Sequence, residues 1–138
     1  MRGKLLIMEG NFFNSRNQYT QAIASYLQAR NYREALPYAE FGLGSVYGSL
    51  DEGEAALNRF TAAAEALGDL PQGADPELVY RIHYNIGVVR FKAEDYAGAA
   101  AAFRHALEID GSRIEAKRNL ELSRLSLGRK PSASAVSP

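Results

Sequence analysis

The side chains that could carry out chemistry are few, and they are not grouped. The chain has two histidines, His83 and His105, and no cysteine. A zinc site or metalloprotease motif needs a spaced cluster such as H-E-x-x-H, and a thiolate ligand or nucleophile needs cysteine. Because neither is present, we interpret both histidines as packing or surface residues rather than as metal ligands or general bases.

The carboxylates are scattered along the chain in the same way. They occur at expected helix ends, as in Asp51-Glu52 and Glu94-Asp95, where capping and solvation explain them. A catalytic pair must converge in a pocket that shifts its pKa values, and no spacing here indicates such a pair. Gly42, Gly44 and Gly48 lack the G-x-x-x-x-G-K-[ST] order of a phosphate-binding loop. The sequence therefore predicts that the protein is not an enzyme and has no cofactor and no metal.

Composition indicates a folded domain of ordinary size. The chain has 138 residues, of which 46% are hydrophobic, with 16 basic and 16 acidic side chains. Nucleic-acid binders usually carry a basic excess, so we expect no nucleic-acid partner. No segment has the ~20 apolar residues of a membrane span. The apolar run Leu5-Leu6-Ile7-Met8 is too short for a signal peptide. This slightly favours the cytoplasm, although the sequence does not determine the compartment.

A spaced set of small and aromatic residues occurs three times. The first copy is Gly10, Ala22, Tyr26 and Ala29. The second copy is Gly44, Ala56, Phe60 and Ala63. The third copy is Gly87, Ala99, Phe103 and Ala106. The first two copies are offset by 34 residues, and the third is offset by a further 43, which is one period plus a nine-residue insertion at 71–79.

This period and these residue types resemble the tetratricopeptide repeat (TPR) family, in which each unit is a pair of antiparallel helices. The resemblance implies an all-α fold: a right-handed superhelical stack of three helix-turn-helix units and a C-terminal capping helix. We expect the repeat glycine and the first alanine to lie where the backbones of the paired helices approach most closely. We expect the aromatic residue to fill the volume between units. Glu9, Gly53 and Arg90 depart from the family pattern.

The repeat phase predicts the boundaries of the helices and of the domain. Helix pairs are expected at 3–15 and 18–31, 34–49 and 53–67, and 76–92 and 96–109. The predicted domain covers 1–127, with repeats at about 3–36, 37–70 and 80–113 and a capping helix at about 114–127. Residues 128–138 are small, polar and proline-containing, and we predict a flexible tail. The insertion at 71–79 is interpreted as a tolerated surface loop or, alternatively, as a loop that determines specificity.

The resemblance implies that the first helices of the pairs line a concave groove for an extended peptide or a partner helix. Mapping by repeat phase predicts these peptide-binding residues: Asn11, Tyr38, Phe41, Ser45, Arg81, Tyr84, Asn85, Val88 and Asn119. Asparagine can pair with a peptide backbone, and aromatic rings supply rigid contact area. Packing between helices is an equal alternative for Phe41. Binding is favoured for Asn85 and Asn119, because an inward-facing amide needs a partner.

The predicted function is a protein-interaction module that acts as an adaptor or scaffold. Some TPR proteins bind the C-terminal carboxylate of a chaperone through a five-residue basic clamp. The matching positions here are Ile7, Asn11, Gly42, Arg81 and Asn85. Only Asn11 and Arg81 fit by type, so a chaperone-tail adaptor is not predicted.

The alternative function is a structural subunit that self-assembles through its groove or its end faces. For the segment 129–138 we hypothesise docking in the groove of a second copy, which would give self-association through the tail. The sequence does not identify the partner protein, because the shape of a groove is not periodic.

Overall fold

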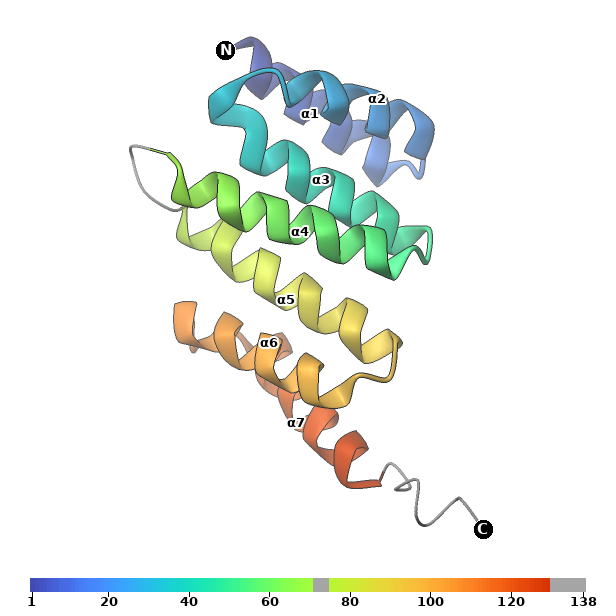
Figure 1. The fold of residues 1–138 in the computed structure, drawn as a ribbon, viewed down its shortest axis with the longest axis vertical. Helices are drawn as coiled ribbons and strands as arrows, with labels where there is room; N and C mark the ends of the chain where they lie inside the picture. Colours follow the sequence, from blue (N-terminus) through green and yellow to red (C-terminus); the bar gives the residue numbers. More distant parts are fainter. Residues whose placement is uncertain (71–74, 130–138) are drawn as a thin grey trace. The chain divides into compact units, whose positions relative to one another are not determined.

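The computed structural model describes residues 1–70 and 75–129, which form seven α-helices and one short 3₁₀ turn (Figure 1). The elements are α1 (Arg2–Ser15), α2 (Tyr19–Ala29), η1 (Arg33–Ala35), α3 (Leu36–Ser49), α4 (Gly53–Gly68), α5 (Pro76–Lys92), α6 (Tyr96–Ile109) and α7 (Ile114–Arg129). These residues contain no strand. The predicted all-α fold class is confirmed.

The predicted helix boundaries agree with the observed ones to within two residues at each end. A 3₁₀ turn precedes α3, and Pro37 lies in the first turn of α3, where a missing N–H is least costly. The helix α7 continues to Arg129 and so includes the first two residues assigned to the tail. The rest of the predicted tail, and residues 71–74 of the insertion, lie outside the described residues. No described helix is long and apolar enough to cross a bilayer.

The turn inside each helix pair has one residue in the left-handed region. These residues are Asn17, Asp51 and Glu94, with φ of 60°, 59° and 61°. They recur after 34 residues and then after 43, as the repeat does. In each turn the following residue donates its N–H to the carbonyl five positions back, as in a Schellman motif. The repeat therefore sets the turn geometry as well as the packing.

The chain divides into two compact units, residues 1–82 and 83–138, and α5 contributes to both. In the first unit α1 packs against α2 and α3, and α3 packs against α4. In the second unit α6 packs against α7. Each unit is described by itself below.

The three repeat glycines are needed because an aromatic ring lies against each of them. A Cβ added at Gly87 would lie 2.5 Å from Cε1 of Phe103. Gly10 and Gly44 face Tyr26 and Phe60 in the same way. The expectation that close backbone approach excludes a side chain here was wrong, since the nearest atoms belong to the ring. Each ring packs directly on the glycine of its own repeat, and the Tyr26 ring also lies against Gly42 of the next repeat.

An ionic cluster around a buried carboxylate joins three helices of the first unit. Glu40 of α3 is only 5% exposed. Its carboxylate accepts two hydrogen bonds from Nη1 of Arg59 on α4, at 2.9 and 3.0 Å. Nε of Arg30, at the end of α2, lies 3.5 Å from Oε1 of Glu40. Because a buried carboxylate must keep its partners, this cluster restricts rotation of α3, and α3 carries three of the predicted binding residues.

The two histidines form a pair in the second unit. The rings of His83 on α5 and His105 on α6 have centroids 5.4 Å apart. Burial lowers the pKa of His83, and the neighbouring His105 lowers it further. Among the described residues, no group of three or more His, Asp or Glu side chains could hold a metal ion.

This pairing predicts that the protein loses stability in mild acid. The folded-state pKa of His83 lies below its unfolded value of about 6.5. The unfolded chain therefore binds more protons as the pH falls through 6.5, and the free energy of unfolding decreases. Urea unfolding at about pH 7.5 and about pH 5.5 should show this decrease, and His83→Gln should make it smaller. An equal decrease in wild type and His83→Gln would refute the assignment to His83.

Candidate functional site

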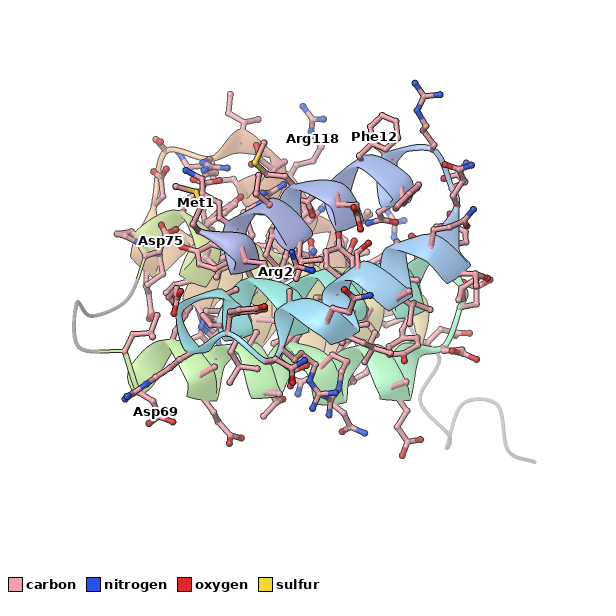
Figure 2. The ribbon with its side chains drawn as sticks, turned by 90° about the horizontal axis from the view of Figure 1, so that it is seen from above. Met1, Arg2, Phe12, Asp69, Asp75 and Arg118 are labelled. Carbon is pink, nitrogen blue, oxygen red and sulfur yellow. The ribbon has the colours of Figure 1, made fainter. Side chains whose placement is uncertain are left out.

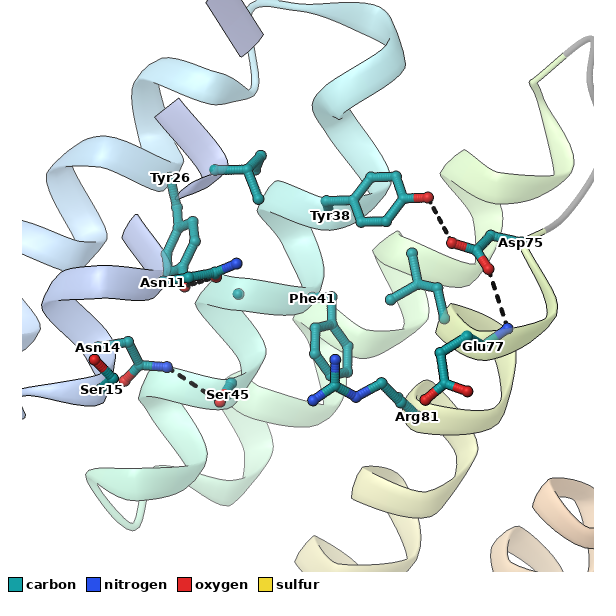
Figure 3. A pocket seen from close by; sticks show the side chains of 13 residues that line it. Asn11, Asn14, Ser15, Tyr26, Tyr38, Phe41, Ser45, Asp75, Glu77 and Arg81 are labelled. Atoms are coloured by element: carbon teal, nitrogen blue, oxygen red, sulfur yellow. Dashed lines mark hydrogen bonds between the residues drawn. The ribbon is translucent and has the colours of Figure 1, made fainter. Parts of the chain in front are cut away.

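A pocket of about 400 Å³ lies between α1, α3 and the start of α5, entirely within the first unit (Figure 3). It contains all five of the predicted binding residues that belong to this unit. The lining residues are Ile7, Asn11, Asn14, Ser15, Tyr26, Tyr38, Phe41, Gly42, Ser45, Asp75, Glu77, Leu78 and Arg81.

Helical spacing explains why these side chains share one pocket. Residues 7, 11 and 14 of α1 lie four and three positions apart, as do residues 38, 41 and 45 of α3. Positions with this spacing lie on one face of a helix. Leu78 and Arg81 are three apart on α5 and form the third wall. Each wall is therefore one face of a first helix, as the repeat phase predicts.

The back of the pocket is formed by Tyr26, which reaches in from α2. Its ring lies against Gly10 of α1 and also against Gly42 of α3, where an added Cβ would be 2.5 Å from a ring carbon in each case. The hydroxyl of Tyr26 donates to Oδ1 of Asn11 at 2.6 Å. Burial raises the pKa of Tyr26 to about 12, so the hydroxyl stays protonated at neutral pH. The side chain of Asn11 is thereby held with its amide nitrogen directed toward α3 (Figure 3).

A second tyrosine connects α3 to the start of α5. The hydroxyl of Tyr38 donates to Oδ2 of Asp75 at 2.7 Å. The other oxygen, Oδ1, accepts the backbone N–H of Glu77 at 3.1 Å, so Asp75 caps α5 as its position before Pro76 predicts. Burial raises the pKa of Tyr38 to about 12, and the Asp75 carboxylate contributes to the rise. Tyr38 and Asp75 therefore form one end of the pocket, where both oxygens of the Asp75 carboxylate already accept hydrogen bonds.

Arg81 is a cationic side chain in the lining of the pocket, and it is held by an aromatic ring. The guanidinium carbon of Arg81 lies 5.7 Å from the ring centroid of Phe41. Phe41 in turn packs against Phe60 of α4, with centroids 5.6 Å apart. An arginine stacked on a ring loses less freedom when it binds an anionic or carbonyl group. Phe41 therefore packs between helices and also lines the pocket.

The polar wall of the pocket continues along α1 and α3. Nδ2 of Asn14 lies 3.4 Å from Oγ of Ser45, at the long end of hydrogen-bond distances. An adjoining hollow of about 430 Å³ is mostly apolar and is lined by Lys4, Ile7, Met8, Glu34 and Tyr38. Because Ile7 and Tyr38 belong to both cavities, an extended ligand could occupy the two together.

The other predicted binding residues lie in the second unit. Nδ2 of Asn119 donates to the hydroxyl of Tyr84 at 2.9 Å. This amide group has a partner inside the chain, so the argument that it needs an external partner does not hold for that N–H. Tyr84 and Val88 are partly buried and pack against the cluster of Ala99, Ala100, Phe103 and Leu120. Asn85 is also partly buried.

The pocket also includes residues that the sequence did not indicate as binding residues. Tyr26 was assigned to packing because it is the repeat aromatic, but it also lines the pocket, where its hydroxyl bonds Asn11. Asp75 was recognised as a helix cap. Glu77 has the same repeat phase as Glu34, ten positions before the repeat glycine, and neither was predicted to bind. A search for polar residues one turn before Arg81 on the same helix would have found Glu77.

Comparison with known proteins agrees with the repeat. A family model described as tetratricopeptide repeat matches residues 80–112, nearly the third predicted repeat. The chain is similar to the first TPR domain of human RPAP3, with 19% identity, a TM-score of 0.79 and 94% of each chain covered. It is also similar to the TPR domain of Sgt2 from Aspergillus fumigatus, with 25% identity and a TM-score of 0.77, covering 99% of this chain and 84% of that one. Residues 80–112 therefore match a tetratricopeptide repeat, and the fold of the chain is that of TPR domains.

A third similar structure contains a ligand. It is the first TPR of Spaghetti (RPAP3) bound to the HSP90 peptide SRMEEVD, with 18% identity and a TM-score of 0.79, covering 92% of this chain and 96% of that one. No functionally curated protein sequence matched the chain. The TPR fold of this chain is therefore one that presents a peptide-binding surface in another protein.

Proposed function

We propose that this TPR protein binds an extended peptide or a partner helix of another protein and acts as a non-catalytic adaptor or scaffold. The observation that carries the proposal is the pocket of about 400 Å³ between α1, α3 and α5. A similar TPR domain has been solved with a bound peptide. We also propose that residues 1–127 serve as one binding domain, as the repeat spacing predicts.

The chemistry of the pocket suits a peptide backbone with mixed side chains. The amide groups of Asn11 and Asn14 offer donors and acceptors. Arg81 offers a stacked cation, the carboxylate of Glu77 lies beside it one turn earlier on α5, and the carboxylate of Asp75 lies at the Tyr38 end (Figure 3). A ligand that is only anionic would meet those carboxylates. We therefore propose a ligand that presents backbone carbonyls or one acidic group near Arg81.

The proposed binding residues of the second unit are Tyr84, Asn85, Val88 and Asn119. Tyr84 and Asn119 are bonded to each other, which orders both side chains before a ligand arrives. Ordering of this kind reduces the entropy lost on binding.

The proposal predicts that Arg81→Ala weakens binding of the partner. Truncation removes a charge-assisted contact of about 1.5–3 kcal/mol, so affinity should fall roughly tenfold or more. The partner can be captured from an extract of the native host on immobilised wild-type protein and identified by mass spectrometry. Its affinity for purified wild type and Arg81→Ala can then be measured by calorimetry.

Arg16→Ala is the matched control for this measurement. Arg16 also stacks on a phenylalanine, with its guanidinium carbon 4.7 Å from the Phe12 ring, but it does not line the pocket. We expect Arg16→Ala to bind as wild type does. Equal affinity for wild type and Arg81→Ala would place the partner elsewhere. The peptide SRMEEVD should bind weakly or not at all, because Ile7 and Gly42 occupy two of the five clamp positions.

A further inference from the structure

Four large apolar side chains, three on α1 and one on its N-cap residue, form an exposed row. They are Met1, Leu5, Met8 and Phe12, which are 88%, 57%, 57% and 52% exposed. The side chains of α1 that pack inward lie on the opposite side of the helix, at Gly3, Leu6 and Gly10. Met1 and Phe12 mark the two ends of the row in Figure 2. A contiguous apolar row of this length on a folded surface indicates an interaction site.

The spacing of the row indicates that its partner is another helix. Its members are four, three and four residues apart, which is the a/d spacing of a coiled-coil seam. At about 100° per residue the four positions fall within about 60° of one another. A helix that lies on a membrane surface usually has a wider apolar face. The narrow row therefore fits the groove of a second helix better than it fits a lipid surface.

Charges beside the row identify a second copy of the chain as that partner. Arg2 lies on the flank of α1 that faces α2 (Figure 2). Glu9 lies on the same flank, where it accepts a hydrogen bond from Ser25 of α2 at 2.7 Å. When two α1 helices are placed antiparallel about a two-fold axis between Leu5 and Met8, Leu5 meets Met8 of the second copy. Arg2 then faces Glu9 of the second copy, and the symmetry makes this pair occur twice. The antiparallel direction also aligns the helix dipoles favourably.

We propose that α1 is a self-association surface, through which two copies of this chain form an antiparallel helix pair. The row does not line the pocket of about 400 Å³, because Ile7, Asn11 and Asn14 lie on a different face of α1. Of the row, Met8 also lines the adjoining hollow. A dimer of this kind leaves the pocket of each copy open. The adaptor would then present two binding sites, and a partner with two copies of its peptide would bind by avidity.

The first test is the mass of the purified protein against concentration. Four side chains per copy make a small interface, so we expect a dissociation constant of about 10–100 µM. Sedimentation equilibrium from about 1 µM to about 1 mM should show a rise from the 15.1 kDa monomer toward twice that mass. The double variant Leu5→Gln with Phe12→Gln should raise the dissociation constant about tenfold or more. Leu27→Gln is the matched control, because Leu27 is an exposed leucine of α2 outside the row.

Charge exchange tests the antiparallel arrangement. Arg2→Glu alone and Glu9→Arg alone each bring like charges together and should weaken the dimer several-fold at low salt. The variant with both substitutions should recover wild-type association, because the pairs are restored with reversed sign. In a parallel pair Glu9 would instead face Lys4, and the double variant would not recover. Circular dichroism melting of each variant separates a lost interface from a lost fold.

Three results would overturn the proposal. The first is a protein that stays monomeric at about 1 mM. The second is a dimer whose dissociation constant is the same in wild type and in the Leu5→Gln, Phe12→Gln variant. The third is a monomer that sediments with phosphatidylserine vesicles through the same residues, which would assign the row to a membrane surface.

Discussion

Replacing Gly87 with leucine is expected to destabilise the protein by about 3 kcal/mol. A Cβ at this position would lie 2.5, 2.7 and 2.8 Å from three carbons of the Phe103 ring. Phe103 is 1% exposed and packs with Ala99, Ala100 and Leu120, so the ring can move only by disturbing α6 and α7. Intrinsic helix propensity alone would predict the opposite sign, since leucine favours a helix over glycine by roughly 0.8 kcal/mol.

Gly68→Leu is the control, because it shows the effect of leucine on stability where no ring lies against the glycine. Gly68 lies at the end of α4, and no atom is within 4 Å of a Cβ added there. We expect this variant to be as stable as wild type or slightly more stable. Urea unfolding followed by circular dichroism would measure both variants on the same scale. A wild-type unfolding midpoint for Gly87→Leu would show that the Phe103 ring does not depend on Gly87.

The repeat predicted which positions are constrained but not which atoms constrain them. Periodicity showed that Gly10, Gly44 and Gly87 must be small, because the same residue returns in the same phase. It could not show that a ring rather than a backbone lies against each glycine. That distinction depends on the side-chain rotamers of Tyr26 and Phe103. Helix boundaries were easier to predict, because the left-handed turn residues recur with the repeat.

Part of the candidate site could also be predicted from the repeat, and part could not. Asn11, Phe41 and Arg81 line one pocket because repeat phase determines the face of a helix. The bond between Tyr84 and Asn119 joins residues 35 positions apart, and no local pattern predicts such a pair. Asp75 lies within the insertion at 71–79, so its place in the pocket wall depends on where α5 begins. The repeat phase predicts which face of a helix a residue lies on. It does not predict which side chains on neighbouring helices contact each other.

Removing residues 114–138 is expected to cause aggregation or to abolish cooperative unfolding. In the second unit α7 packs along α6, and its Ala116, Leu120 and Ser123 are buried. Leu120 contacts the cluster that contains Ala99 and Phe103, so deletion would expose an apolar face of α6 to water. The end of a repeat array needs a helix with a polar outer face to remain soluble, and exposed apolar patches promote association.

Static light scattering and calorimetric melting of residues 1–113 would test this capping role. A chain that ends at Arg129 is the matched control, because it keeps all of α7, and it should melt as the full chain does. Leu120→Ala is the milder variant. The cavity that it leaves should lower the free energy of unfolding by about 2–5 kcal/mol, while the apolar face of α6 stays covered by α7. We expect it to melt at a lower temperature and remain soluble, whereas 1–113 aggregates. If the 1–113 chain is soluble and melts cooperatively, α6 does not need α7 to cover it.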